Sequence, residues 1–187
     1  MLNRFALAVA APLLLYQGRR VRRTTPRLPE PPGDRAGRAS NAQQPKLRLL
    51  LLGDSAIAGV GCATQQEAVT GQLVSLLTPH YDLEWQLIAR SSLTCAQVLQ
   101  HLRESKLQLS QVDTVVVSVG VNDVTKRTSL SEWRASLAAM TAFLIEHLGA
   151  QTVLYTALPP MHKFPALPQP LRWFVGQQAL QLNKALH

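Results

Sequence analysis

The sequence predicts an α/β fold with three layers, in which helices cover both faces of a parallel, flavodoxin-like sheet. From Leu47 onward, short apolar runs alternate with segments whose apolar residues recur every three or four positions. The third run, TVVVSV, is rich in valine, which is typical of a strand buried on both faces. Strands that alternate with helices imply right-handed crossovers, and such crossovers make the strands parallel.

The apolar runs predict four strands, and helical spacing fills the intervals between them. The strands are expected at residues 47–52, 83–89, 114–119 and 152–158, and the helices at about 67–77, 95–106 and 130–148. In the last of these helices, Ser129 and Glu132 fit a capping box, and Gly149 fits the residue just past its end. A further helical pattern begins at Leu171. Together these elements predict one domain over residues 47–187.

The residues before this domain divide into two parts. Residues 5–16 are largely apolar, but they are fewer than the ~20 that span a bilayer, and the basic run RRVRR follows them. We predict that residues 1–23 lie on a membrane surface, with the cytoplasmic face favoured because the arginines suit anionic headgroups. The alternatives are a signal peptide, as in a periplasmic or secreted protein, and a disordered tail. Residues 24–46 are rich in proline, glycine and charge, which predicts a linker.

The charge of the chain is confined to its N-terminal part. Residues 1–48 hold ten Lys/Arg and two Asp/Glu, whereas the remaining residues hold nine of each, so the first part accounts for the whole net charge of +8. A nucleic-acid-binding domain is expected to carry its basic stripe on the folded part of the chain. The distribution therefore speaks against a nucleic-acid partner.

The two cysteines predict neither a disulfide framework nor a metal site. Cys62 and Cys95 do not form a C-x-x-C pair, and no histidine lies near them at ligand spacing. We expect free, mostly buried thiols in a reducing compartment.

Two of the predicted strands end in polar clusters. Gly-Asp-Ser follows the first strand at 53–55, and Gly-Val-Asn-Asp follows the third at 120–123. The carboxyl ends of parallel strands meet at one edge of the sheet, so Ser55 and Asn122 are expected to face each other. A serine at such a turn lies near backbone amides and can act as a nucleophile, while an asparagine supplies a neutral donor to an oxyanion. Taken singly, each cluster is also typical of an ordinary turn or helix cap.

Three sequence blocks carry a family resemblance. The segments LLLGDSAIAGVG, ARSSLT and VSVGVNDV resemble, in order, the first three blocks of the SGNH hydrolases, also called GDSL-type esterases and lipases, and the resemblance runs from about residue 47 to the end. It implies hydrolysis of small-molecule or lipid esters with no metal or organic cofactor. The resemblance implies that Ser55 is the nucleophile. It also implies three donors to the oxyanion, namely the backbone N–H groups of Ser55 and Ser92 and the side-chain N–H of Asn122.

The chain departs from the family pattern at three points. Ala56 replaces the leucine of G-D-S-L, and Ser92 stands where the family usually has glycine. No D-x-x-H block, which supplies the catalytic histidine and its aspartate, follows Asn122. We therefore expect a chain that ends before this block, without the C-terminal strand and helix, and that is nearly inert in this form. The alternatives are a catalytically dead, membrane-tethered binding module and a carbohydrate O-acetyl transferase or deacetylase.

The remaining site residues are predicted from their position. His162 follows the fourth strand on the catalytic edge, where it lines the substrate pocket or, alternatively, serves as the base. Asp54 and Gly120 border the same site and are also expected to bind the substrate, and Asp54 and Asp123 are expected to brace turns. The fourth strand is an apolar sheet edge in this reading, which predicts self-association.

Overall fold

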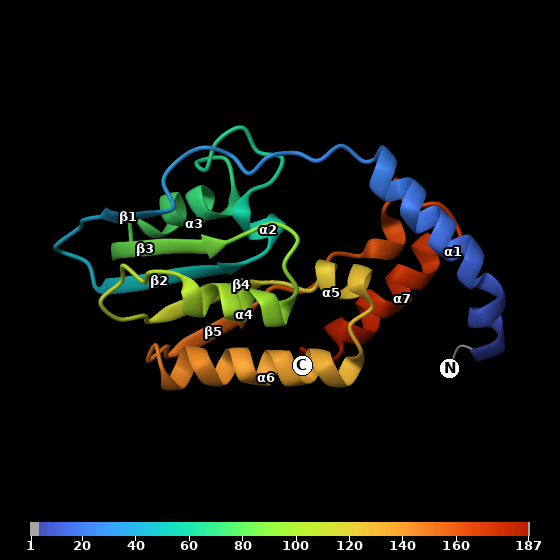
Figure 1. Ribbon diagram of the computed structural model, residues 1–187. Coiled ribbons are helices and arrows are strands. Elements are labelled where there is room, and N and C mark those ends of the chain that lie inside the picture. Colours follow the sequence, from blue (N-terminus) through green and yellow to red (C-terminus); the bar gives the residue numbers. More distant parts are fainter. Residues whose placement is uncertain (1–3, 187) are drawn as a thin grey trace.

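The computed structural model describes residues 4–186, and these contain one five-stranded sheet. Figure 1 shows the arrangement of its strands. The strand order is β1-β3-β2-β4-β5. The strands are β1 Ala36–Ala39, β2 Lys46–Gly53, β3 Asp82–Ala89, β4 Thr114–Ser118 and β5 Thr152–Tyr155. Strands β2 to β5 are parallel, and β1 pairs with β3 in the antiparallel direction. The predicted α/β class, the parallel sheet and all four predicted strands are confirmed.

Helices cover both faces of this sheet (Figure 1). The helices of the described chain are α1 Arg4–Thr24, α2 Ser55–Ala58, α3 Val69–Leu77, α4 Cys95–Glu104, α5 Val121–Lys126, α6 Leu130–Glu146 and α7 Leu171–Asn183, with a short 3-10 helix, η1, at Met161–Lys163. Helix α1 packs against α7 and lies away from both faces of the sheet (Figure 1). Leu49 and Leu51 of β2 pack on the side of α2 and α3, whereas Leu50 and Leu52 pack on the side of α4 and α6. All four are at most 2% exposed, so consecutive leucines of one strand fill two separate cores.

The predicted periodicity of α6 is confirmed. Trp133, Leu137, Met140 and Leu144 are buried, and the Trp133 indole N–H donates to the backbone oxygen of Leu182 in α7. The predicted capping box is also present at the start of this helix. Strand β5 ends three residues earlier than predicted, and the Leu158 N–H donates over 2.7 Å to the side-chain oxygen of Asn183 in α7 instead of to the neighbouring strand.

The structure corrects the predicted linker over 24–46. Residues Ala36–Ala39 form β1, which pairs with Leu83–Gln86 at the edge of the sheet. The sequence AGRA has no apolar alternation, so hydrophobic patterning does not reveal this strand. Its stability comes from backbone pairing with β3, which is present only once the sheet has formed.

The N-terminal helix α1 extends beyond the apolar segment that the sequence indicated. Its Leu14 is 3% exposed, and the Gln17 side chain exchanges hydrogen bonds with the backbone of Gln169 and Leu171 near α7. Among the described residues, no helix has the length and apolar character needed to cross a membrane. The placement of residues 1–23 on a membrane surface stays a prediction, and Met1 to Asn3 lie outside the described residues.

Candidate active site

Gly53 ends β2 at a point where the backbones of three strands converge. Its carbonyl oxygen accepts a hydrogen bond of 3.2 Å from the Arg90 N–H after β3, and the next N–H, of Asp54, donates over 3.0 Å to Ser118 at the end of β4. A Cβ atom on Gly53 would overlap the Ser118 carbonyl oxygen. Only glycine therefore fits, and the following residues are held tightly at the carboxyl edge of the sheet.

Ser55 is the first residue of α2 and lies directly at this edge. Asp54 caps the helix, because its Oδ1 accepts a hydrogen bond of 3.1 Å from the Ala56 N–H. The Ser55 side chain is half-buried. Within residues 4–186, neither its hydroxyl nor its N–H has a hydrogen-bond partner, so both are available to a ligand.

Asn122 lies in the first turn of α5, opposite this turn. Its Nδ2 donates a hydrogen bond of 3.0 Å to Oδ2 of Asp54. The two polar clusters that the sequence placed at one sheet edge are thus joined, as expected. Nδ2 carries two hydrogens, and the second is left for a ligand.

Asp54 braces the site instead of facing solvent. It is 2% exposed, and each of its oxygens accepts a hydrogen bond. Burial raises the pKa of this carboxyl, and the neighbouring charge of Asp123 raises it further, although the hydrogen bonds from Ala56 and Asn122 work in the opposite direction. A bracing role agrees with the sequence analysis, whereas a contact of Asp54 with substrate stays a prediction.

Ser92 lies in the loop after β3 with a left-handed backbone, φ 69°. This conformation suits glycine, the residue that the family pattern has at this position, and it is rarely adopted by residues with a Cβ. The Ser92 carbonyl oxygen accepts a hydrogen bond of 3.0 Å from Nζ of Lys126. Its N–H has no partner within the described part of the chain, which is the condition for a ligand-binding amide.

Asp123 is the second buried carboxyl of the site and braces the start of α4. Its Oδ2 accepts a hydrogen bond of 3.0 Å from the Cys95 N–H, and its Oδ1 accepts one of 3.3 Å from the Thr128 hydroxyl. Burial raises the pKa of Asp123. Burial also raises the pKa of the Cys95 thiol to about 12, so this free cysteine is unreactive. The expectation of free thiols is confirmed, although Cys62 is only partly buried.

The other two candidates border the carboxyl edge in different ways. Gly120 is the N-cap residue just before α5, with φ 118°, and a Cβ there would press on the Leu158 side chain. His162 is exposed in η1, beyond the carboxyl end of β5. Among the residues that the structure describes, no histidine is hydrogen-bonded to Ser55, and the terminal His187 lies outside them.

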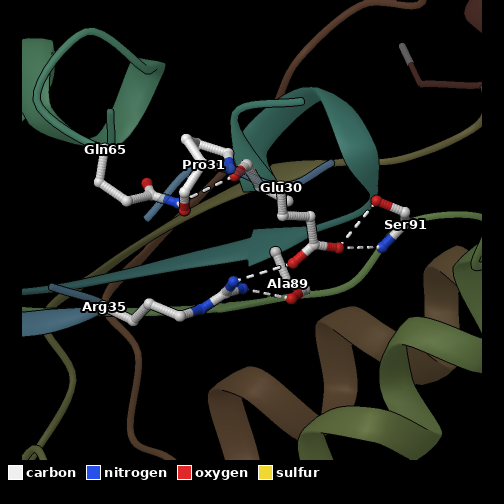
Figure 2. Close-up of polar contacts among 7 residues, drawn as sticks. Glu30, Pro31, Arg35, Gln65, Ala89 and Ser91 are labelled. Atoms are coloured by element: carbon white, nitrogen blue, oxygen red, sulfur yellow. Dashed lines mark hydrogen bonds and ion pairs between the residues drawn. The ribbon is translucent and has the colours of Figure 1, made fainter. Parts of the chain in front are cut away.

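Sequence reasoning missed two charged residues that contact the loop carrying Ser92. Lys126 lies one helical turn after Asn122, a spacing that places both on one face of α5 and could have identified it. Glu30 accepts hydrogen bonds from Ser91 (Figure 2). It lies in the proline-rich segment before β1, and no sequence signal connects it with this loop.

A separate cleft of about 670 Å³ opens between α1, α5 and α7. Leu14 and Phe174 contribute apolar surface to it, and Arg19, Arg22 and Arg127 contribute charge. The three predicted catalytic residues do not line this cleft. The catalytic edge and the cleft are therefore distinct features of the surface.

Comparisons with known proteins agree with the architecture. A family model described as the GDSL-like lipase/acylhydrolase family matches residues 51–187. An acetylxylan esterase from Geobacillus stearothermophilus has a similar structure, with a TM-score of 0.54 at 16% identity over 76% of this chain and 72% of that one. An α/β hydrolase from the metagenome of Lake Arreo, Spain, has a TM-score of 0.52 at 14% identity over 75% and 74%. At these identities the two structures establish the fold. The search of curated proteins gave no match.

Proposed function

The chain belongs to the GDSL-like lipase/acylhydrolase family, and from this premise we propose that it hydrolyses carboxylic esters through an acyl intermediate on Ser55. The family is one of ester hydrolases, so the reaction class follows from membership. The roles of individual residues and the nature of the ester belong to the proposal.

The observation that carries the proposal is the group of available donors around Ser55. The N–H groups of Ser55 and Ser92 have no partner within residues 4–186, and the Asn122 amide is fixed by Asp54 with one hydrogen to spare. Such preorganised donors stabilise the negative charge that develops on an ester carbonyl oxygen, and removing one typically costs ~10²–10³ in turnover.

In the proposed reaction, the Ser55 oxygen attacks the ester carbonyl carbon and its proton passes to a base. The tetrahedral oxyanion that forms accepts hydrogen bonds from Ser55, Ser92 and Asn122. The alcohol then leaves with a proton, and water hydrolyses the acyl-serine to release the acid. No D-x-x-H follows Asn122 in the printed sequence, and within residues 4–186 no histidine is hydrogen-bonded to Ser55, so the base is not assigned to a residue here.

Acetyl esters are the first substrate class to test. One of the structural neighbours is described as an acetylxylan esterase, and the small acetyl group makes no demand on an acyl pocket. Transfer of the acetyl group to a sugar in place of water is the alternative outcome for the same nucleophile.

The test is hydrolysis of p-nitrophenyl acetate by the parent chain, by Ser55→Ala and by the control Ser75→Ala, which removes an exposed hydroxyl from α3. We expect Ser55→Ala to reduce p-nitrophenol release to the buffer rate and Ser75→Ala to match the parent. Mass spectrometry of the quenched parent should find one acetyl group on the peptide that contains Ser55. Unchanged release by Ser55→Ala would overturn the proposal. Acetylated sugar as the main product would identify a transferase.

A further inference from the structure

The carboxylate of Glu30 is bonded to the loop that follows β3 (Figure 2). Its Oε1 accepts hydrogen bonds of 2.8 Å from both the N–H and the hydroxyl of Ser91. Ser91 directly precedes Ser92, whose amide belongs to the proposed oxyanion site. One side chain of the N-terminal segment thus fixes the residue next to a catalytic amide.

Arg35 holds the other side of this carboxylate. Its guanidinium donates a hydrogen bond of 3.0 Å to Oε2 of Glu30 and a second one to the carbonyl oxygen of Ala89, the last residue of β3 (Figure 2). Its backbone oxygen accepts a hydrogen bond of 2.6 Å from the Leu87 N–H. Arg35 is therefore aligned with the end of β3, and Glu30 with the loop that leaves it.

The two residues after Glu30 are bonded to the loop on the Ser55 side of the site. The side chain of the buried Gln65 donates over 3.4 Å to the carbonyl oxygen of Pro31 (Figure 2). It also donates over 3.0 Å to the carbonyl oxygen of Ala58. Its backbone N–H donates over 3.0 Å to Pro32. Since Ala58 is the last residue of α2, residues 30–32 connect the helix of the nucleophile with the loop of the second amide.

We propose that Glu30 is a positioning residue that keeps the Ser92 amide directed at the oxyanion. This inference rests on the proposed function. It acts through Ser91 and does not touch the substrate itself. The strand β1, which follows Arg35, holds this segment in register against β3 and so determines where Glu30 reaches.

The backbone of Ser92 explains why the loop needs such a contact. A left-handed conformation is unfavourable for a residue with a Cβ, so an unrestrained loop would tend to leave it. Lys126 fixes the carbonyl side of Ser92, and Glu30 fixes the peptide before it. Burial alone would raise the pKa of Glu30, but the hydrogen bonds from Ser91 and the Arg35 charge outweigh it and lower this pKa. Glu30 is thus ionised at neutral pH, and an ionised carboxylate accepts stronger hydrogen bonds than a neutral group does.

The test compares Glu30→Ala and Glu30→Gln with the matched control Glu84→Ala, in the full chain. Glu84 is a carboxylate of similar exposure that also pairs with an arginine of the N-terminal segment, Arg38, but it lies away from the loop. NMR measures hydrogen exchange of the Ser91 amide, and hydrolysis of p-nitrophenyl acetate gives kcat and KM. Loss of a hydrogen bond to a carboxylate should speed exchange in Glu30→Ala by about tenfold or more.

We expect Glu30→Ala to lower kcat about 10- to 100-fold with little change in KM, because a displaced oxyanion donor acts only in the transition state. Glu30→Gln retains an acceptor for Ser91 and should recover most of both losses, and Glu84→Ala should match the parent. Parent-like exchange and parent-like kcat in Glu30→Ala would overturn the positioning role. If instead Ser55→Ala hydrolyses as fast as the parent, the proposed function fails, and exchange of the Ser91 amide still decides whether Glu30 holds the loop.

Discussion

The side-chain amide of Asn122 donates a hydrogen bond of 3.0 Å to the carboxylate of Asp54, although 67 residues of chain separate them. Because Asp54 also caps α2, this bond ties the turn that carries Ser55 to the turn that carries Asn122. It orients the asparagine amide before any substrate binds, and such preorganisation is what electrostatic stabilisation of a transition state requires.

Replacement of Asn122 by alanine is expected to lower kcat for p-nitrophenyl acetate by ~10²–10³ with little change in KM, since one oxyanion donor is lost. The rate of p-nitrophenol release at saturating ester measures this effect. Asn41→Ala, which removes an amide from a turn before β2, is the control and should leave the rate unchanged. A parent-like kcat in Asn122→Ala would show that this amide does not contact the oxyanion.

Ser92→Gly is expected to raise the free energy of unfolding by about 0.5–1 kcal/mol, because glycine relieves the left-handed backbone at φ 69° by more than it adds to the entropy of the unfolded chain. Urea unfolding measures the change. The same substitution at Ser75, within α3, should destabilise by about 0.5–1 kcal/mol. If Ser92→Gly and Ser75→Gly changed the free energy of unfolding in the same direction, the backbone at Ser92 would not be strained.

The ion pair between Arg48 and Asp113 makes stability depend on pH. The Arg48 side chain donates hydrogen bonds of 2.9 and 2.7 Å to the two carboxylate oxygens, and its backbone N–H adds one of 2.8 Å. Hydrogen bonds from Arg48 lower the pKa of Asp113 below its ordinary value of 3.8, against the opposing effect of burial. This stabilisation is therefore complete above 3.8 and is lost as the pH falls through the lowered pKa.

We expect Asp113→Asn to be less stable than the parent by about 1.5–3 kcal/mol at neutral pH, and the difference to shrink as the pH falls below 3.8. The raised pKa values of Asp54 and Asp123 have the opposite sign, since acid relieves the cost of burying their charges. These contributions are common to both proteins and cancel in the difference. Urea unfolding at a series of pH values measures the difference in the free energy of unfolding between the two proteins. A difference that stays constant as the pH falls would show that the ion pair between Arg48 and Asp113 does not cause it.

Strand β5 is the outer strand of the sheet within the described residues, and its Leu154 is 53% exposed. We expect the chain to self-associate through this edge, and Leu154→Lys to reduce the association because an edge lysine opposes strand pairing. Light scattering over a range of concentrations measures the mass. Leu76→Lys, at a 68% exposed position of α3, is the control and should associate like the parent. A parent chain that stays monomeric at high concentration would contradict the expectation.

Much of the fold was predictable because the buried residues of strands and helices are apolar and recur at regular spacing in the sequence. The leucines of β2 and the spacing of Trp133, Leu137 and Met140 in α6 reflect two cores on either side of one sheet. Strand β1 has no such pattern, since its four residues are held by backbone hydrogen bonds and not by buried side chains. Patterning therefore identifies the elements that build the core and misses those that attach to its edge.

The candidate site likewise has features that the sequence predicts and features that it does not. The proximity of Ser55 and Asn122 follows from two facts that a sequence contains, namely where strands end and which edge parallel strands share. The contact of Glu30 with Ser91 depends on how a proline-rich segment crosses the loops of the finished sheet, which local residue types do not specify. The left-handed backbone at Ser92 lies between these cases, because the family pattern has glycine there.

The two outer strands of the sheet differ in a way that limits the size of any assembly. Both strands are four residues long, but β1 carries Arg38, a charged residue that discourages further pairing, whereas β5 presents an exposed leucine. Two copies that join β5 to β5 around a two-fold axis would use up both apolar edges and leave only charged ones outward. Association is thus expected to close at a dimer and not to continue into filaments.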